Sequence, residues 1–395
     1  MMLLKHLRAW SFAEVTREVR ANLVYREFTG IGGGKVPADK TMGRLARQLA
    51  PETVEKLHQR VVAIALEKQA VTGRKMRVDT TVVETNIHYP TDSTLLNDGV
   101  RVLTRVMKKV AAVAGEAGAK LRDYSRSVKR RVLEIALASR DKSEKGQAKM
   151  KVAYGKLLVT TSRVVAQAKK FSTEIAAKVK RGPRKVMRKA QQQLDEMIPR
   201  VKQVMQQTRQ RVIDGDTHVK NKILSMFEPE TEVIRKGKAS KPTEFGKMVK
   251  IQEAENQIVT DYEVFDERPS DSDLLTPSIE THTEIFGRAP RLVAADAGFF
   301  SAANEATAKE LGVKRVSVPS RSTKSEKRKL EQKKRWFKNA QKWRTGCEGR
   351  ISVLKRRHGL NRSLYKGANG MKRWVGLGVI ADNIINIGVH LSAKC

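Results

Sequence analysis

The sequence contains very little cysteine and few aromatic residues. Two of its 395 residues are Cys, at positions 347 and 395, which excludes a disulfide framework and a four-cysteine zinc site. So few thiols predict a reducing, cytoplasmic compartment. Aromatic residues make up 5% of the chain. No basic stretch has the aromatic apolar face that an interfacial membrane helix needs.

Long uninterrupted apolar segments are also missing. The longest apolar stretch near an end of the chain, Trp374–Leu391, contains Asp382, Asn383 and Asn386. The apolar run within the opening residues MMLLKHLRAW is too short for the hydrophobic region of a secretory signal. We therefore expect no membrane span and no export signal.

Acidic residues are scarce relative to basic ones. The chain has 79 Lys and Arg against 42 Asp and Glu, a net charge of +37. Residues 101–220 hold 31 basic and 10 acidic side chains, and residues 301–395 hold 23 and 6. This charge excludes a small-molecule enzyme of ordinary charge and favours a nucleic-acid partner over a membrane surface.

The first part of the chain, residues 1–72, predicts a helical domain. Ser11 and Glu14 form a capping-box pattern, apolar residues follow at helical spacing to Phe28, and the glycines of GIGGGK then end the helix. A helix near residues 41–49 and another that begins at Pro51 complete the domain. It can read DNA, mediate dimerisation or only support the rest of the chain, and the sequence leaves these alternatives open.

Residues 100–222 predict a basic helical insertion. Apolar residues recur at helical spacing, and Gly146 and Gly182-Pro183 are the visible breaks. We expect two or three long antiparallel helices, with a basic disordered tether as the alternative.

The remaining residues, 73–99 and 223–395, predict one catalytic domain of the α/β class. KMRVDTTVVE reads as a strand, a strand meander follows Gly215, and RLVAADAGFF and RVSVP read as strands separated by a helix. A mixed sheet with helices on its faces is the expected fold, and the first strand has to join it because a lone strand would leave unpaired edges.

Three acids in this domain are the candidate catalytic and metal-binding residues. Asp79 lies inside an apolar strand, Asp296 follows a short apolar strand, and Glu348 is the only acid in a strongly basic helix. A carboxylate in an apolar strand is costly unless a cation compensates it. Carboxylate oxygens suit hard cations, so we expect two Mg²⁺ ions, or Mn²⁺, for in-line phosphodiester displacement.

Basic residues surround the third acid. Arg344 lies four residues before Glu348 and Lys355 seven residues after it, which places them on one helix face. We expect these two residues to bind phosphates and Arg350, Arg356 and Arg357 to extend the DNA-binding track.

Four segments resemble those of bacterial insertion-sequence DDE transposases, particularly the fifth-family and ISNCY-like groups. They are VDTTVVETNIHYPTDS, GKASKPTEFGK, VAADAGFFSAANE and RWFKNAQKWRTGCEGRISVLKRRHGL. The resemblance implies an RNase H-like catalytic domain in which Asp79, Asp296 and Glu348 are the three acids. Around its third acid the family has Tyr, Arg, Glu and Lys. Arg344, Glu348 and Lys355 match, whereas Gln341 stands at the Tyr position.

The resulting hypothesis is a DNA transposase that cuts element ends and joins the 3′-hydroxyl to target DNA. Its expected partners are double-stranded DNA, both terminal inverted repeats and target, and a second copy of the chain in an active homodimer. The alternatives are an RNase H-fold metal-dependent nuclease without strand transfer and a non-catalytic DNA-binding protein.

Overall fold

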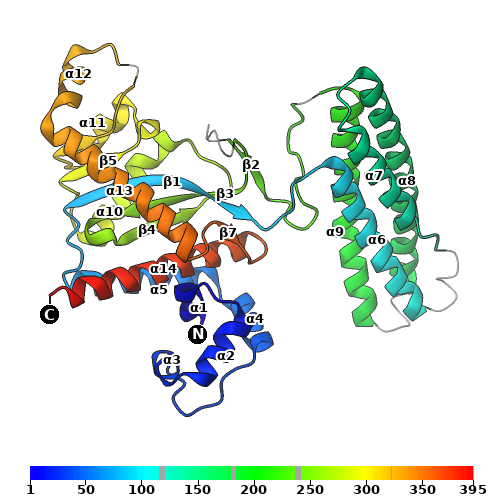
Figure 1. The fold of residues 1–395 in the computed structure, drawn as a ribbon, viewed down its shortest axis with the longest axis horizontal. Helices are drawn as coiled ribbons and strands as arrows, with labels where there is room; N and C mark the ends of the chain where they lie inside the picture. The colour runs from blue at the N-terminus through cyan, green and yellow to red at the C-terminus, as the bar shows by residue number, and fades with distance from the viewer. Residues whose placement is uncertain (115–120, 179–183, 217, 236–241, 322, 395) are drawn as a thin grey trace. The chain divides into compact units, whose positions relative to one another are not determined.

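The computed structural model describes residues 1–114, 121–178, 184–216, 218–235, 242–321 and 323–394. These residues form two compact units (Figure 1). The first, here called the sheet unit, combines Met1–Asn86 with Glu232–Cys395, and the second, the helical unit, is Ile87–Thr231. The chain therefore leaves the sheet unit after its first strand and returns to it for the remaining strands.

Seven strands in the described residues form one sheet in the sheet unit. They are β1 (Lys75–Thr85), β2 (Glu232–Ile234), β3 (Glu244–Glu253), β4 (Val259–Val264), β5 (Leu292–Ala295), β6 (Arg315–Ser317) and β7 (Arg362–Ser363). The order is β2-β3-β1-β5-β6, with β4 also paired to β3 and β7 to β1. β3 runs antiparallel to β1, β2 and β4, whereas β5 and β7 run parallel to β1, and β6 parallel to β5. The expected mixed α/β sheet that includes the first strand is confirmed.

Helices cover this sheet and extend from it (Figure 1). They are α1 (Met2–Arg8), α2 (Phe12–Ala21), α3 (Leu23–Phe28), α4 (Asp39–Gln48), α5 (Pro51–Glu67), α10 (Leu275–Phe286), α11 (Ala302–Glu310), α12 (Glu326–Lys333), α13 (Arg335–Arg357) and α14 (Ala368–Ser392).

The two faces of β1 pack against different helices. Met76 and Val78 lie in a buried cluster with Ile279 of α10, whereas Val83 lies in another with Leu354 of α13. Because successive side chains of a strand point to opposite faces, Asp79 shares its face with Val83. The sheet therefore directs Asp79 towards the side on which α13 packs.

The N-terminal helices form largely as the sequence predicts. The Ser11 Oγ accepts from the Glu14 amide at 3.1 Å, and the Ser11 amide donates to Glu14 Oε2 at 2.7 Å, which confirms the capping box. The single helix expected up to Phe28 is instead broken at Asn22, whose Oδ1 accepts from the first amides of α3. Leu23 is consequently 82% exposed.

The helix that begins at Pro51 also forms and buries Val54, but among its apolar residues Leu57 is left outside the buried face. Leu57 is 45% exposed, whereas its neighbour His58 is 3% exposed. The His58 Nε2 lies 3.0 Å from the carbonyl oxygen of Val259, and its ring packs edge-on against Tyr262. A tertiary hydrogen bond therefore sets the orientation of this helix.

The helical unit contains four long helices in its described residues, where we expected two or three. They are α6 (Asp92–Ala114), α7 (Ser125–Ala138), α8 (Glu144–Lys178) and α9 (Arg184–Thr208). A break occurs close to the predicted position, between α7 and α8 at residues 139–143, and Gly146 itself lies in the first turn of α8. Gly182-Pro183, the other predicted break, lies outside the described residues, as do Gly237 and the adjoining part of GKASKPTEFGK.

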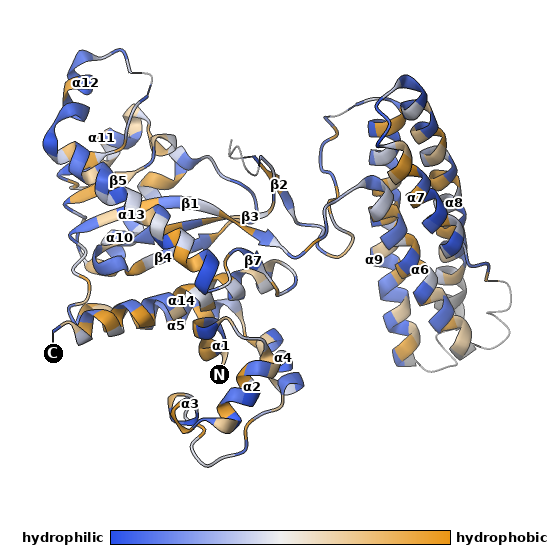
Figure 2. Cartoon of the chain, in the orientation of Figure 1, coloured by the Kyte–Doolittle hydropathy of each residue, from blue (hydrophilic) through white to orange (hydrophobic). Residues whose placement is uncertain are grey.

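The buried stripe expected for the first helix of this unit is present. Val100, Leu103, Val106 and Val110 are each at most 3% exposed and lie in one large apolar cluster. Figure 2 shows the hydrophobic residues of these helices interleaved with hydrophilic ones. Among the described basic residues of this unit, Arg105, Lys109, Lys149 and Lys156 are exposed outside this packed helical core.

One helix in the described residues, α14, is long and apolar enough to pass a length and composition test for a membrane span. Figure 2 shows hydrophobic residues along much of it. It packs against α5, α1 and β4, and its Asp382 and Asn383 are buried and hydrogen-bonded. These contacts are those of a core helix.

Candidate active site

The first two candidate acids lie at the same level of neighbouring strands. β1 and β5 are parallel, and Val78 is paired with Ala295 in their register. Asp79 and Asp296 each follow that pair by one residue, so both carboxylates reach one end of the strand pair. Their side chains are 17% and 46% exposed. Asp296 follows the carboxyl end of β5, a position at which α/β sheets place ligands, whereas Asp79 lies within β1, which continues to Thr85.

Local backbone contacts hold the two carboxylates. Oδ1 of Asp79 accepts from the following amide of Thr80 at 2.7 Å, and Oδ1 of Asp296 accepts from the amide of Ala297 at 2.6 Å. Arg321 Nη2 also lies 3.8 Å from Asp296 Oδ1, as an exposed ion pair. One oxygen of each carboxylate is thus oriented by its own chain before any ligand binds.

Arg344 on α13 brings the third acid to the other two. Its Nη2 donates to Glu348 Oε1 at 2.8 Å, and its Nη1 lies 3.5 Å from Asp79 Oδ2. Burial acts to lower the pKa of Arg344, but the Glu348 hydrogen bond and the charges of all three acids outweigh burial and raise that pKa. A single guanidinium therefore lies among the three predicted acids.

The three acids have the chemistry of a divalent-cation site, and the positive charge beside them is the Arg344 guanidinium. Among the described residues, no three His, Cys, Asp or Glu side chains lie close enough together to hold a metal ion. The three acids supply only carboxylate oxygens, which hard cations such as Mg²⁺ prefer. The donor chemistry therefore suits a divalent cation, but in the described positions the Arg344 guanidinium is paired with Asp79 and Glu348, and the acids form no three-ligand set.

The predicted phosphate-binding residues separate into two groups. Arg356 and Arg357 are exposed in the last turn of α13, and Lys355 is half-buried beside them. Arg350 is instead 6% exposed, and its Nη1 donates to the buried Asp382 of α14 at 2.7 Å. This internal ion pair is inconsistent with the predicted DNA contact, because the guanidinium is already enclosed and neutralised.

Sequence reasoning missed two charged residues that hold α13 on the sheet. Arg77 of β1 is buried, forms an ion pair with the buried Glu253 of β3, and donates through Nη1 to the carbonyl oxygen of Trp343. Its guanidinium also stacks on the Trp343 ring, 4.7 Å from the centroid. Arg77 lies two residues before Asp79 in the same apolar strand. A charged residue in an apolar strand is the pattern that indicates Asp79, and it indicates Arg77 as well.

A third missed residue is Asp271, which supports the turn after β5. Its Oδ1 accepts from the hydroxyl of Thr80 at 3.0 Å. A Cβ added at Gly298 would lie 3.1 Å from Asp271 Oδ2, so this turn packs closely against the carboxylate. Gly298 thus provides space for Asp271.

Gln341, which stands where the resembled family has Tyr, has a structural role in this fold. Its amide nitrogen donates to the carbonyl and hydroxyl oxygens of Ser317 at 2.6 and 3.0 Å, so it ties α13 to the end of β6. Gln341 therefore positions the helix on which Arg344 and Glu348 lie.

The fold and site define an α/β protein with three carboxylates gathered beside a basic helix. Residues 304–387 match the family model described as the transposase DDE domain. The matched segment is about a fifth of the chain and includes Arg344, Glu348 and Lys355, so the similarity to this domain is shown for that segment. Neither the curated proteins nor the solved structures contain a match to the chain.

Proposed function

We propose that this protein is an insertion-sequence transposase that cuts DNA at the ends of its element and joins the freed 3′-hydroxyl to target DNA. The observation that supports this most directly is the contact of one guanidinium with acids from β1 and α13 beside the acid that follows β5. Residues 304–387 match a transposase DDE domain, which agrees with it.

Asp79, Asp296 and Glu348 would hold two divalent ions, Mg²⁺ or Mn²⁺. When bound, such ions activate the attacking water or 3′-hydroxyl and stabilise the leaving oxygen. The protein's own side chains bind and orient the scissile phosphate.

Arg344 is the phosphate-binding residue nearest to the acids. It is 13% exposed, and three carboxylates neutralise it in the absence of DNA. Its fork of donors can bind a phosphate through two hydrogen bonds. When a backbone phosphate arrives, the guanidinium exchanges a carboxylate for it and draws the phosphate towards the acids.

Lys355, Arg356 and Arg357 extend this contact along the DNA backbone. They lie in the last turn of α13, where the helix dipole also favours positive side chains. Arg350 does not take part in this DNA contact, because its guanidinium is paired internally with Asp382. The basic outer face of the helical unit supplies further salt-dependent affinity.

The proposal includes the domain organisation predicted from the sequence. Residues 1–72 form an N-terminal helical domain, residues 73–99 and 223–395 the catalytic domain, and residues 100–222 a basic insertion. Two copies act together as a homodimer, because two element ends have to be processed in one reaction. Terminal inverted repeats and target DNA are the two substrates.

The test uses labelled DNA from the flanks of the coding region, incubated with the protein and Mg²⁺. Products in which the labelled end is joined to a second DNA support the transposase. Nicked DNA without joined products indicates a nuclease without strand transfer. DNA that is bound but remains intact indicates a non-catalytic binding protein, and either of the last two results overturns the proposal.

A further inference from the structure

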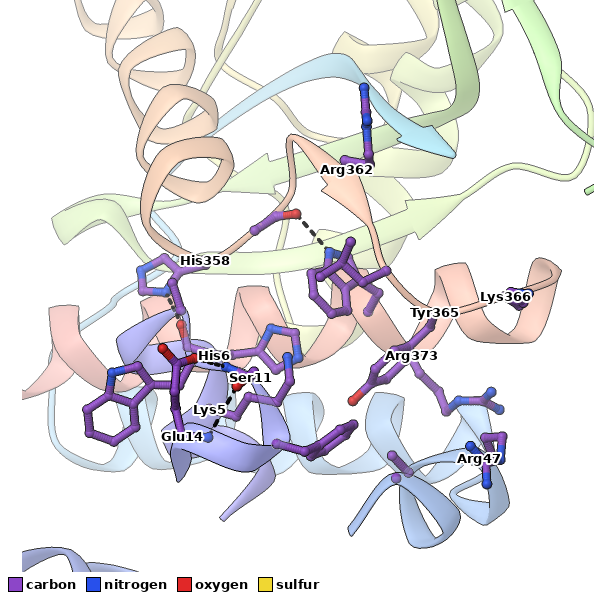
Figure 3. Close-up of a pocket in the computed structure, with 18 of the residues that line it drawn as sticks. Lys5, His6, Ser11, Glu14, Arg47, His358, Arg362, Tyr365, Lys366 and Arg373 are labelled. Carbon is purple, nitrogen blue, oxygen red and sulfur yellow. Dashed lines mark hydrogen bonds between the residues drawn. The ribbon is translucent and has the colours of Figure 1, made fainter. Parts of the chain in front are cut away.

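A large pocket lies between the N-terminal helices and the segment that joins α13 to α14. Its volume is about 1000 Å³. Lys5 and His6 of α1 and Phe12 of α2 line it from one part of the chain, and Tyr365 and Arg373 line it from the other (Figure 3). All these elements belong to the sheet unit.

Lys5 is the most unusual residue in this pocket. It is 6% exposed, yet in the described part of the chain no acid pairs with its ammonium group. The Nζ lies 4.5 Å from the ring centroid of Trp374, 5.4 Å from that of Phe12 and 5.8 Å from that of Tyr365. Burial lowers the pKa of Lys5 to about 8, so the side chain is still mostly charged at neutral pH.

Other buried polar atoms of the pocket lining also lack a hydrogen-bond partner in the described residues. They are His6 Nε2, Tyr365 Oη and Arg373 Nε. His6 is 2% and Arg373 8% exposed, so water does not satisfy these groups freely. Unsatisfied buried polar groups are costly, so this lining is polar as well as aromatic.

The charge of the lining favours an anion. Arg47, Arg362 and Lys366 add to the positive charge of Lys5 and Arg373. Glu14 is the acid that lines the pocket, and its carboxylate already accepts the Ser11 amide in the capping box. The excess of basic over acidic side chains in this lining disfavours a metal ion or an organic cation.

Aromatic rings and cations together match one ligand chemistry. The rings of Phe12 and Tyr365 are stacked, with planes 12° apart and centroids 6.4 Å apart, and Trp10 and Trp374 lie beside them. Nucleobases stack on such rings, and phosphates bind to lysine and arginine. The volume exceeds what a single phosphate needs and is of the size of pockets for drug-sized ligands.

We propose that this pocket binds one nucleotide unit, with its base against the aromatic rings and its phosphate on the Lys5 ammonium. A free mononucleotide and an unpaired nucleotide of a DNA strand share this chemistry. The DNA source rests on the proposed function.

The position of the pocket agrees with a DNA source. The C-terminal part of its lining starts at His358, directly after the exposed Arg356 and Arg357 of α13. Arg362 of the lining pairs with Glu84 at 3.1 Å, near the end of the strand that contains Asp79. A strand that leaves the acids along the last turn of α13 therefore reaches this pocket next.

The experiment uses the full chain and two probes at about 0.3 M salt, where surface charges are strongly screened. One probe is deoxyadenosine monophosphate, followed by calorimetry. The other is a short single-stranded oligonucleotide with 2-aminopurine, whose fluorescence is quenched when it stacks on an aromatic ring. The test variant is Lys5→Met, and the matched control is Lys56→Met, which removes one exposed charge from α5 of the same unit.

We expect Lys5→Met to weaken binding by about tenfold to a hundredfold, as for loss of a charge-assisted hydrogen bond, and Lys56→Met by less than twofold. The melting temperature of Lys5→Met should stay close to that of the unsubstituted protein, since the loss of the cation–π contacts is offset by removal of a buried charge. This stability check separates a loss of binding from a loss of folding. A second variant, Phe12→Leu, should reduce the quenching of 2-aminopurine.

Each outcome has a distinct meaning. Mononucleotide binding that depends on Lys5 supports a free nucleotide, and Lys5-dependent quenching of the oligonucleotide alone supports an unpaired nucleotide of DNA. If neither probe binds, or if Lys5→Met equals Lys56→Met, the proposal is overturned. Asp79→Asn should leave pocket binding intact, so a failure of the proposed cleavage function would not affect this result.

Discussion

The Nη1 of Arg344 lies 3.5 Å from Oδ2 of Asp79, an ion pair between a helix near the end of the chain and a strand near its beginning. The same guanidinium donates to Glu348 at 2.8 Å. Asp79 and Glu348 are separated in sequence by the whole helical unit. The fold thus gathers acids that no local sequence pattern connects, and their joint function can be tested residue by residue.

Asp79→Asn and Glu348→Gln should each reduce Mg²⁺-dependent end cleavage by about a thousandfold or more, because each change removes a charge that binds the cation. DNA binding should remain, since neither variant removes a positive charge. Cleavage of labelled end DNA and a gel-shift assay measure the two effects. Glu326→Gln, an exposed acid on α12, is the control. Near-normal cleavage by either site variant would exclude that acid from the site.

Arg344→Met should separate the functional role of this residue from its structural one. Glu348 is 56% exposed, so its pair with Arg344 contributes less than about 1 kcal/mol to the free energy of unfolding, and the variant also loses the less exposed contact of Arg344 with Asp79. End cleavage should fall at least tenfold, because the scissile phosphate loses its nearest guanidinium. Thermal unfolding and cleavage rates are compared with those of Lys309→Met, which removes another exposed i, i+4 pair. A large loss of stability with normal cleavage would make Arg344 a structural residue only.

Two glycines of α13 provide a matched test of how this helix docks. A Cβ at Gly346 would lie 2.3 Å from Arg77 Nη1, whereas no atom lies within 4 Å of a Cβ at Gly349. Arg77 is held by Glu253 and the Trp343 carbonyl, so it has little room to move. Gly346→Ala should therefore lower the free energy of unfolding by about 1 to 3 kcal/mol.

Gly349→Ala should instead raise that free energy by up to about 1 kcal/mol, because alanine loses less backbone entropy in a helix. Chemical denaturation of both variants measures the difference. Equal effects of the two substitutions would show that Arg77 does not fix the position of α13.

Elements whose sequence signals are local can be predicted from the sequence alone. The strand around Asp79 was recognisable from its Val and Thr residues, and the capping box of Ser11 needs only residues three apart. The faces of helices were harder to predict because distant partners determine them. His58 is buried in place of Leu57 through the Val259 carbonyl, about two hundred residues away.

The same limitation explains the error at Arg350. Along α13 this residue has the same character as Arg356 and Arg357, and only the position of Asp382 on α14 distinguishes it. The three acids were identified because a charge in an apolar or oppositely charged setting is itself a local signal. The contacts of Arg344 with Glu348 and Asp79 were predictable only in part, since the spacing to Glu348 is helical but the approach to Asp79 depends on the sheet.

The helical unit should contribute much of the salt dependence of DNA binding. Arg105, Lys109, Lys149 and Lys156 are exposed on α6 and α8. Each phosphate contact adds about 0.9 to the slope of log K against log salt on duplex DNA. Replacement of all four by Gln should therefore reduce the slope by about 2 to 4, without unfolding the unit, because the apolar core is untouched.

Titration of binding to labelled duplex DNA between about 50 and 200 mM salt measures this slope. A variant with the exposed acids Asp123 and Glu134 changed to Asn and Gln serves as the control, since it leaves the cations in place and should not reduce the slope. An unchanged slope in the fourfold Gln variant would show that DNA does not contact these faces of the helical unit. The affinity would then have to come from the basic residues of the sheet unit.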